Sequence, residues 1–126
     1  MLDTKAPTHY RWEDITAEKL KGSITRRLIT GDSMMIAEVC LAKGELVPKH
    51  AHHNEQITYI TSGALQFKLG DHGEREVVVH AGEVLVIPPN VPHSAYALED
   101  TVDIDVFSPP REDWLNGSDA YLRDDQ

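Results

Sequence analysis

Short apolar runs, broken at regular intervals by turn-forming residues, are the feature that most constrains how this chain can fold. Between residues 23 and 107 the breaks fall at Gly31–Asp32, Lys43–Gly44, Ser62–Gly63, 70–73, Ala81–Gly82, 88–92 and Glu99–Asp100. Runs this short, rich in Val, Ile and Thr and without a helical period between them, are typical of an all-β sandwich or barrel. We therefore expect one all-β domain over residues 1–126, with a barrel over roughly 23–107.

The two ends of the chain differ in character from this middle region. Residues 1–21 are expected to form an extended arm with one helical turn, in which Asp14 caps residues 15–20. After the last strand, Pro109 and Pro110 end the ladder because proline has no N–H to donate. Ser108 then could cap a short helix that has Pro109 at its first position and continues through residues 111–115.

Charge and composition exclude several classes of partner. The formal net charge of −9 disfavours nucleic acid, which needs a basic surface, and gives no attraction to anionic membranes. No apolar run approaches the roughly 20 residues that cross a bilayer. The single cysteine, Cys40, excludes an internal disulfide, and no secretory signal precedes the strands, so we expect a cytoplasmic protein.

A pair of histidines with a glutamine behind it predicts a metal site. If His50, His52 and Gln56 lie on one strand, their parity places them on the same face. His93, from a later strand, is the candidate fourth ligand. Imidazole and amide groups suit a divalent transition metal, here Zn, Ni, Fe, Mn or Co. The alternative is a pair of surface histidines without a metal.

The final strand has two chemically different faces. Alternation places Val102, Ile104 and Val106 on one face and Asp103, Asp105 and Phe107 on the other. The simple interpretation turns the carboxylates toward water. If instead they face the barrel, Asp105 could act as a proton donor or acceptor with a tuned pKa, and Asp103 is expected to be structural or exposed.

Arg111 follows this strand closely enough to reach back over the barrel opening. Its planar guanidinium is suited to holding a carboxylate of a small anionic substrate through two parallel hydrogen bonds. The alternative is an exposed arginine paired with Glu112 or Asp113, a contact that contributes little to stability.

Two other strands are apolar at every position. Residues 77–79 and 84–87 lack alternation, which is typical of strands buried on both faces. One face would fill the barrel and the other would meet a second sheet or a second subunit, so a homodimer is expected.

Two spaced motifs resemble those of the cupin superfamily. Gly44-x5-His50-x-His52-x3-Gln56-x6-Gly63 is similar to the first cupin motif, with Gln in place of the common Glu. Gly82-x5-Pro88-x-Asn90-x2-His93 is similar to the second, with departures at Asn90 and Ala97. The resemblance implies a single-domain cupin, a jelly-roll barrel of the double-stranded β-helix type, with the short arm and the C-terminal helical turn appended.

A narrower resemblance is to the KdgF family of pectin-degradation cupins. It rests on residues 55–59, on the turn at residues 89–93 and on residues 105–112. It implies a metal held by His50, His52, Gln56 and His93, with Asp105, Phe107 and Arg111 completing a catalytic site. The implied activity is ring-opening tautomerisation of 4,5-unsaturated uronate monomers to linear keto acids. An iron-dependent dioxygenase, or a metal-bearing cupin that binds sugar acids without catalysis, remain alternatives.

Overall fold

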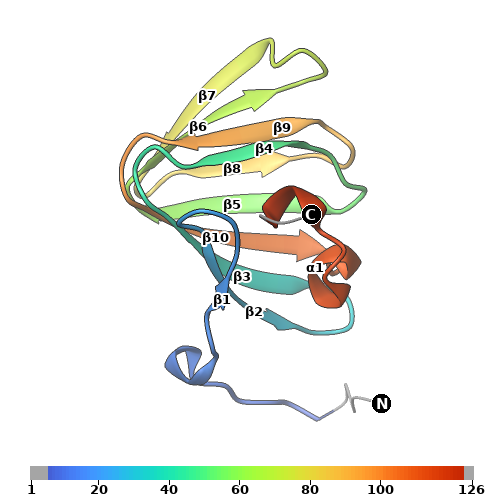
Figure 1. Cartoon of the computed structure of the whole chain (residues 1–126). Helices are drawn as coiled ribbons and strands as arrows, with labels where there is room; N and C mark the ends of the chain where they lie inside the picture. The colour runs from blue at the N-terminus through green and yellow to red at the C-terminus, as the bar shows by residue number, and fades with distance from the viewer. Residues whose placement is uncertain (1–5, 124–126) are drawn as a thin grey trace.

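The computed structural model describes residues 6–123, and its strands form two antiparallel sheets that face each other (Figure 1). The larger sheet has the order β1-β2-β3-β10-β5-β8, and the smaller has the order β4-β9-β6-β7. The strands are β1 (Glu18–Lys19), β2 (Thr25–Thr30), β3 (Met35–Leu41), β4 (Leu46–His50), β5 (Glu55–Ser62), β6 (Ala64–Leu69), β7 (Arg75–His80), β8 (Val84–Ile87), β9 (His93–Ala97) and β10 (Thr101–Ser108). The all-β prediction is confirmed.

The core lies between the two sheets, because each strand turns every second side chain inward. On β5 and β10 this alternation is regular, with Thr58 and Ile60 buried from one strand and Asp105 and Phe107 from the other. Aliphatic and aromatic side chains fill most of the space, and Phe67 of β6 belongs to the same cluster. Polar side chains are buried as well, and among them are His93, Gln56 and Asp105.

Two turns show why particular residues stand between the strands. Gly63 joins β5 to β6 with φ of 88°, and a Cβ there would come within 2.3 Å of the Asp100 carbonyl oxygen, so only glycine fits. Asn90 has φ of 68° in the turn before β9. Asparagine is among the few residues that tolerate this left-handed conformation, which explains how it can stand where cupins commonly have glycine.

The structure corrects the prediction for the N-terminal arm. Instead of a helix over 15–20, the chain forms a 3-10 turn, η1 (Trp12–Asp14), and then β1. Glu18 pairs with Arg26 across the β1–β2 ladder, and its carboxylate accepts a hydrogen bond from the Arg26 guanidinium at 2.7 Å. These tertiary contacts outweigh a weak local helix preference.

The C-terminal helix begins later than the sequence predicts. Helix α1 covers Glu112–Asn116, with extended Arg111 rather than Ser108 before its first residue, and a 3-10 turn, η2 (Ala120–Leu122), follows. The Asn54 amide donates to the Pro109 and Pro110 carbonyls at 2.6 and 3.2 Å and holds that backbone outside the helix. No helix in the described part of the chain has the length and apolar character needed to span a membrane.

The outer face of the larger sheet is apolar and open. Val84 and Val86 of β8 are 57% and 52% exposed, and Ile36, Ile57 and Tyr59 are exposed beside them. The prediction that a second sheet buries the outer face of β8 is therefore wrong for residues 6–123. Covering of this face by a second subunit stays a prediction.

Candidate metal centre and adjoining pocket

Three histidines converge at one end of the space between the sheets. His50 ends β4 and pairs directly with His93, the first residue of β9, while His52 lies in the loop before β5. One ligand atom from each of the three lies within 4.8 Å of the others. The prediction that residues 50–56 form one continuous strand is wrong, because the chain turns at 51–54 and brings Gln56 in from the opposite sheet.

Backbone carbonyls fix the orientation of all three rings. The Nδ1 atoms of His50, His52 and His93 lie 2.7, 3.0 and 2.8 Å from the carbonyl oxygens of Pro48, Asn54 and Val91. A carbonyl can only accept, so each Nδ1 carries the proton and each Nε2 presents a lone pair. This is the arrangement in which histidine usually binds a metal.

Gln56 turns its amide oxygen toward the same point. Its Nε2 donates to Thr58 Oγ1 at 2.8 Å and, at 3.4 Å, to Asp105 Oδ1, which leaves Oε1 facing His52 Nε2 at 3.1 Å. Given the His52 tautomer, these two atoms are both acceptors. Two lone pairs this close repel each other, and a cation that both atoms bind would remove this repulsion.

Burial keeps the imidazoles neutral. It lowers the pKa of His50 to about 3 and that of His52 to about 4, helped by the neighbouring charges of His93 and Arg111. The pKa of His93 is also lowered by burial, and its Nε2 has no hydrogen-bond partner among the described residues. An orphaned buried nitrogen beside other inward-facing acceptors fits a divalent metal, so these residues suit the predicted ion.

The two carboxyl groups of β10 face the interior, contrary to the simple amphipathic interpretation. Asp105 is 5% exposed and accepts a hydrogen bond from Thr58 Oγ1 at 2.7 Å. Asp103, which the sequence predicts to be structural or exposed, is buried, so the prediction of an exposed Asp103 is wrong. Burial raises the pKa of both groups, and the Asp105 charge raises that of Asp103 further.

Arg111 is buried rather than exposed, although it does pair with Asp113 as the alternative interpretation held. Its Nε and Nη2 donate to the two Asp113 carboxylate oxygens at 3.0 and 2.8 Å. The guanidinium carbon lies 5.1 Å from the ring centroid of Phe107 and 4.7 Å from that of Trp114. The aromatic faces favour the cation and compensate part of its lost hydration.

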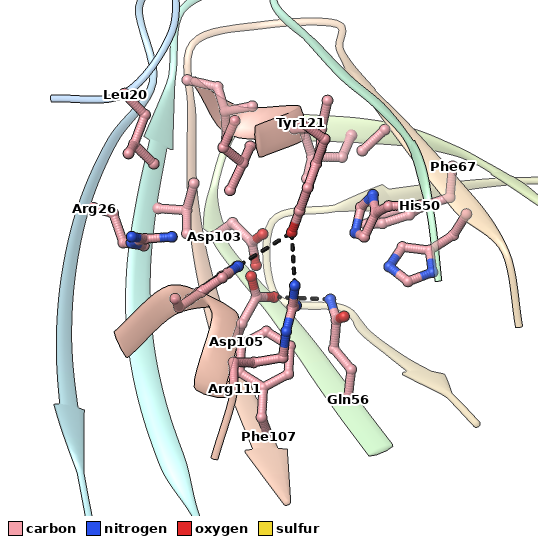
Figure 2. Close-up of a pocket in the computed structure, with 18 residues that line it drawn as sticks. Leu20, Arg26, His50, Gln56, Phe67, Asp103, Asp105, Phe107, Arg111 and Tyr121 are labelled. Carbon is pink, nitrogen blue, oxygen red and sulfur yellow. Dashed lines mark hydrogen bonds between the residues drawn. The ribbon is translucent and has the colours of Figure 1, made fainter. Parts of the chain in front are cut away.

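Three of the four predicted ligands, all but His52, line a common cavity of about 50 Å³ together with the two carboxyl groups of β10 and Arg111. Figure 2 shows Asp105, Arg111 and Tyr121 turned toward its centre, with His50 and Gln56 on one side and Arg26 on another. That volume accommodates a carboxylate group or a few water molecules. Phe107, one of the predicted site residues, forms part of the apolar wall, and its ring lies 5.7 Å from that of His52. His50 and His52 are only half-buried, so the metal site reaches the surface on their side.

Sequence reasoning missed the residues that build the pocket from the C-terminal segment. Tyr121 stacks on His50 with ring centroids 4.2 Å apart. The buried Asp119 carboxylate pairs with the buried Arg26 at 2.9 Å and anchors this segment across the barrel. No spacing in the sequence links residues 93 positions apart. Sequence reasoning also missed Asn54. A short polar residue between a ligand histidine and a strand could have been recognised, because its side chain often bonds to nearby backbone groups.

Comparison with known proteins agrees with this geometry. A model of the cupin domain family matches residues 37–108. The chain is 35% identical over 101 residues to the pectin degradation protein KdgF of Dickeya dadantii, covering 78% of this chain and 89% of that protein. The structure of KdgF from Halomonas sp. has a TM-score of 0.79 and 26% identity, covering 86% of this chain and 99% of that one.

A second, less similar relative is named for a different activity. The chain is 29% identical over 93 residues to 3-hydroxyanthranilate 3,4-dioxygenase of Bacillus thuringiensis, covering 72% of this chain and 52% of that protein. The family model and the coverage of KdgF decide the assignment. The chain belongs to the cupin family and, among cupins, to the family of the pectin degradation protein KdgF.

Proposed function

We propose that this protein is a metal-dependent enzyme that opens the ring of 4,5-unsaturated uronate monomers and yields linear keto acids. The observation that carries the proposal is the position of Asp105. Its buried carboxyl group lies in one cavity with the inward-facing Gln56 amide and the buried Arg111 cation. The family relationship to a pectin degradation protein supports a uronate as the substrate.

The metal would be held by His50, His52, Gln56 and His93. Since all four ligands are neutral, a bound divalent ion keeps its full charge and supplies Lewis acidity toward a substrate oxygen. Arg111 attracts the anionic substrate to the pocket, although the chain as a whole has a net charge of −9. Arg111 thus supplies a positive charge inside the pocket although the net charge of the molecule is negative.

Asp105 is the proton donor in this proposal. When the ring opens, the anomeric hydroxyl becomes an aldehyde by losing its proton, the ring C–O bond breaks, and an enol remains at the other end. The proton lost by the anomeric hydroxyl goes to the ring oxygen, which becomes the enol hydroxyl. Asp105 then donates a proton to the enol carbon while the enol hydroxyl loses its own, which restores the Asp105 proton overall, so the net reaction is an isomerisation. Burial raises the pKa of the Asp105 carboxyl above its ordinary value, the direction that favours a proton donor.

The size of the cavity limits which part of the sugar can enter it. About 50 Å³ holds the carboxylate end but not a whole uronate ring. We expect the rest of the ring to lie toward the half-buried His50 and His52, where the site opens to solvent. Phe107 would then form the apolar wall beside it.

The test is an assay of metal-loaded protein with freshly generated unsaturated uronate monomer. Loss of the absorbance of the conjugated double bond should run well above the spontaneous rate and should stop when a chelator is added. Ring opening no faster than the spontaneous rate by a fully metallated sample contradicts the proposal.

A dioxygenase is the second candidate, favoured by the similarity to 3-hydroxyanthranilate 3,4-dioxygenase. Gln56 argues against it, because a neutral ligand does not help to stabilise a more oxidised iron as a carboxylate would. Oxygen uptake coupled to substrate loss would favour this candidate over ring opening. Uronate binding without any product would favour a non-catalytic sugar-acid binding cupin.

A further inference from the structure

The hydrogen bonds of Arg111 leave only one of its nitrogens free for a substrate. A guanidinium has five N–H groups: one on Nε and two on each Nη. Nε and Nη2 donate to Asp113, and Nη2 also donates to the Tyr121 hydroxyl at 2.8 Å. Nη1 is buried and has no partner within residues 6–123. Asp113 therefore takes up the two parallel hydrogen bonds that the sequence predicts for a substrate carboxylate. A substrate carboxylate can reach only Nη1.

The Tyr121 hydroxyl offers a second donor in the same cavity. It accepts hydrogen bonds from Arg111 Nη2 at 2.8 Å and Trp114 Nε1 at 3.1 Å (Figure 2). With both lone pairs engaged, its own proton must point elsewhere, and no described residue accepts it. A phenol carries its proton at neutral pH, so this hydroxyl can donate to a ligand.

The phenol is held in place from several sides. Its ring stacks on His50 at an interplanar angle of 21°. On one side of it Asp119 pairs with Arg26, and on the other the Leu122 carbonyl accepts a hydrogen bond from the Lys21 amide at 2.9 Å. A donor fixed in this way loses little side-chain entropy when a ligand binds.

We propose that Tyr121 and Arg111 form a single carboxylate-binding element. The Tyr121 hydroxyl donates to one carboxylate oxygen and Arg111 Nη1 donates to the other. The identity of the ligand as a uronate rests on the proposed function, whereas the recognition of a carboxylate can be measured without turnover. The element makes Tyr121 a specificity residue that favours sugar acids over neutral sugars, because a neutral group would leave both buried donors without an acceptor.

The first test measures binding of D-galacturonate by calorimetry with metal-loaded protein. Tyr121→Phe keeps the stacked ring and removes only the hydroxyl, and we expect it to weaken galacturonate binding about tenfold or more. Tyr96→Phe, an exposed tyrosine on β9, is the matched control and should bind as the wild type does. Metal content should be the same in all three proteins. Equal affinities in Tyr121→Phe and wild type, or no galacturonate binding by wild type, would overturn the inference.

Because Tyr121→Phe leaves two donors without their acceptor, the variant could be unstable, and a second measurement uses the wild type alone. A crystal structure with metal and galacturonate should place the carboxylate within hydrogen-bond distance of the Tyr121 hydroxyl and Arg111 Nη1. A carboxylate bound elsewhere in the pocket overturns the inference.

Turnover distinguishes this inference from the proposed function. Ring opening with an unchanged KM in Tyr121→Phe would leave the enzyme assignment in place and refute the role of Tyr121. Tyr121-dependent binding of galacturonate without any ring opening would refute the enzyme assignment and leave the binding element in place.

Discussion

The two faces of β10 reverse the usual distribution of polar and apolar side chains. Asp103, Asp105 and Phe107 point into the barrel and are buried, whereas Val102, Ile104 and Val106 point outward and are half-buried. In an ordinary sheet the aliphatic face would fill the core and the carboxylates would meet water. Here the outward aliphatics continue into the exposed apolar face that Ile36, Ile57, Tyr59, Val84 and Val86 form.

This difference separates the sources of stability from the sources of function. A buried carboxyl group destabilises a fold unless its hydrogen bonds and its protonation state compensate the lost hydration. The buried carboxyl groups on the inner face therefore lower the stability of the fold, and we attribute their presence to a role in catalysis. The outer face of β10 buries no carboxyl group and carries no such cost, and four changes test whether the two faces differ in this way.

The largest effect is expected from removal of a metal ligand on the inner side. His93→Ala deletes the buried Nε2 and should reduce both metal content and turnover to background, with elemental analysis and the ring-opening assay as measurements. His80→Ala, an exposed histidine on β7, is the control and should retain both. Full metal content in His93→Ala contradicts the assigned ligand set.

The next effect is expected from the inward carboxyl group. Asp105→Asn keeps the size of the side chain and removes the proton that it can transfer, so kcat should fall about 10²- to 10⁴-fold while metal content stays constant. Steady-state kinetics together with metal analysis give the answer. A rate close to that of the wild type would remove Asp105 from the mechanism.

A smaller effect concerns stability as a function of pH. The native pKa of Asp103 is raised, chiefly by burial, so its contribution to stability is present below the unfolded pKa of about 3.8 and is lost as pH rises through the native pKa. Asp103→Asn cannot ionise, so its free energy of unfolding should exceed that of the wild type by more at pH 8 than at pH 5. Denaturant titrations at the two pH values measure this. An equal difference at both values would show that the native pKa of Asp103 does not rise into the range between them.

The smallest effect inside the subunit is expected on the outer face. Val86→Lys replaces an exposed side chain and should change the stability of one subunit by no more than about 0.5 kcal/mol, with kcat unchanged. If a second copy of the chain covers this face, sedimentation should show that Val86→Lys dissociates the dimer. Val78→Lys, on the exposed side of β7, is the control. A wild-type protein that sediments as a monomer would contradict the predicted homodimer.

Much of the fold could be predicted because its signals are local. Turn residues marked the strand boundaries, and alternation along β10 correctly divided its side chains into two faces. It could not say which face is inside, since the aliphatic side seemed the natural core.

The site was only partly predictable because it depends on contacts between distant segments. Motif spacing predicts His50, His52, Gln56 and His93, but it does not predict the turn at 51–54, which contains His52 and separates His50 from Gln56. Tyr121 and Asp119 carry no local signal at all. Their roles follow from the position of the C-terminal segment against β4 and Arg26, which is a property of the packed molecule.

The three carbonyl contacts to the histidine Nδ1 atoms have a consequence for how a purified sample should be interpreted. Because the rings are aimed before any ion arrives, little of the binding free energy is spent on ordering them, and neutral nitrogen and oxygen ligands accept several first-row ions. Occupancy then follows the supply of metals in the expression host and the general affinity order of divalent ions. The element found in the protein will therefore report on the growth medium as much as on the physiological cofactor, and reconstitution with defined metals is the way to identify the latter.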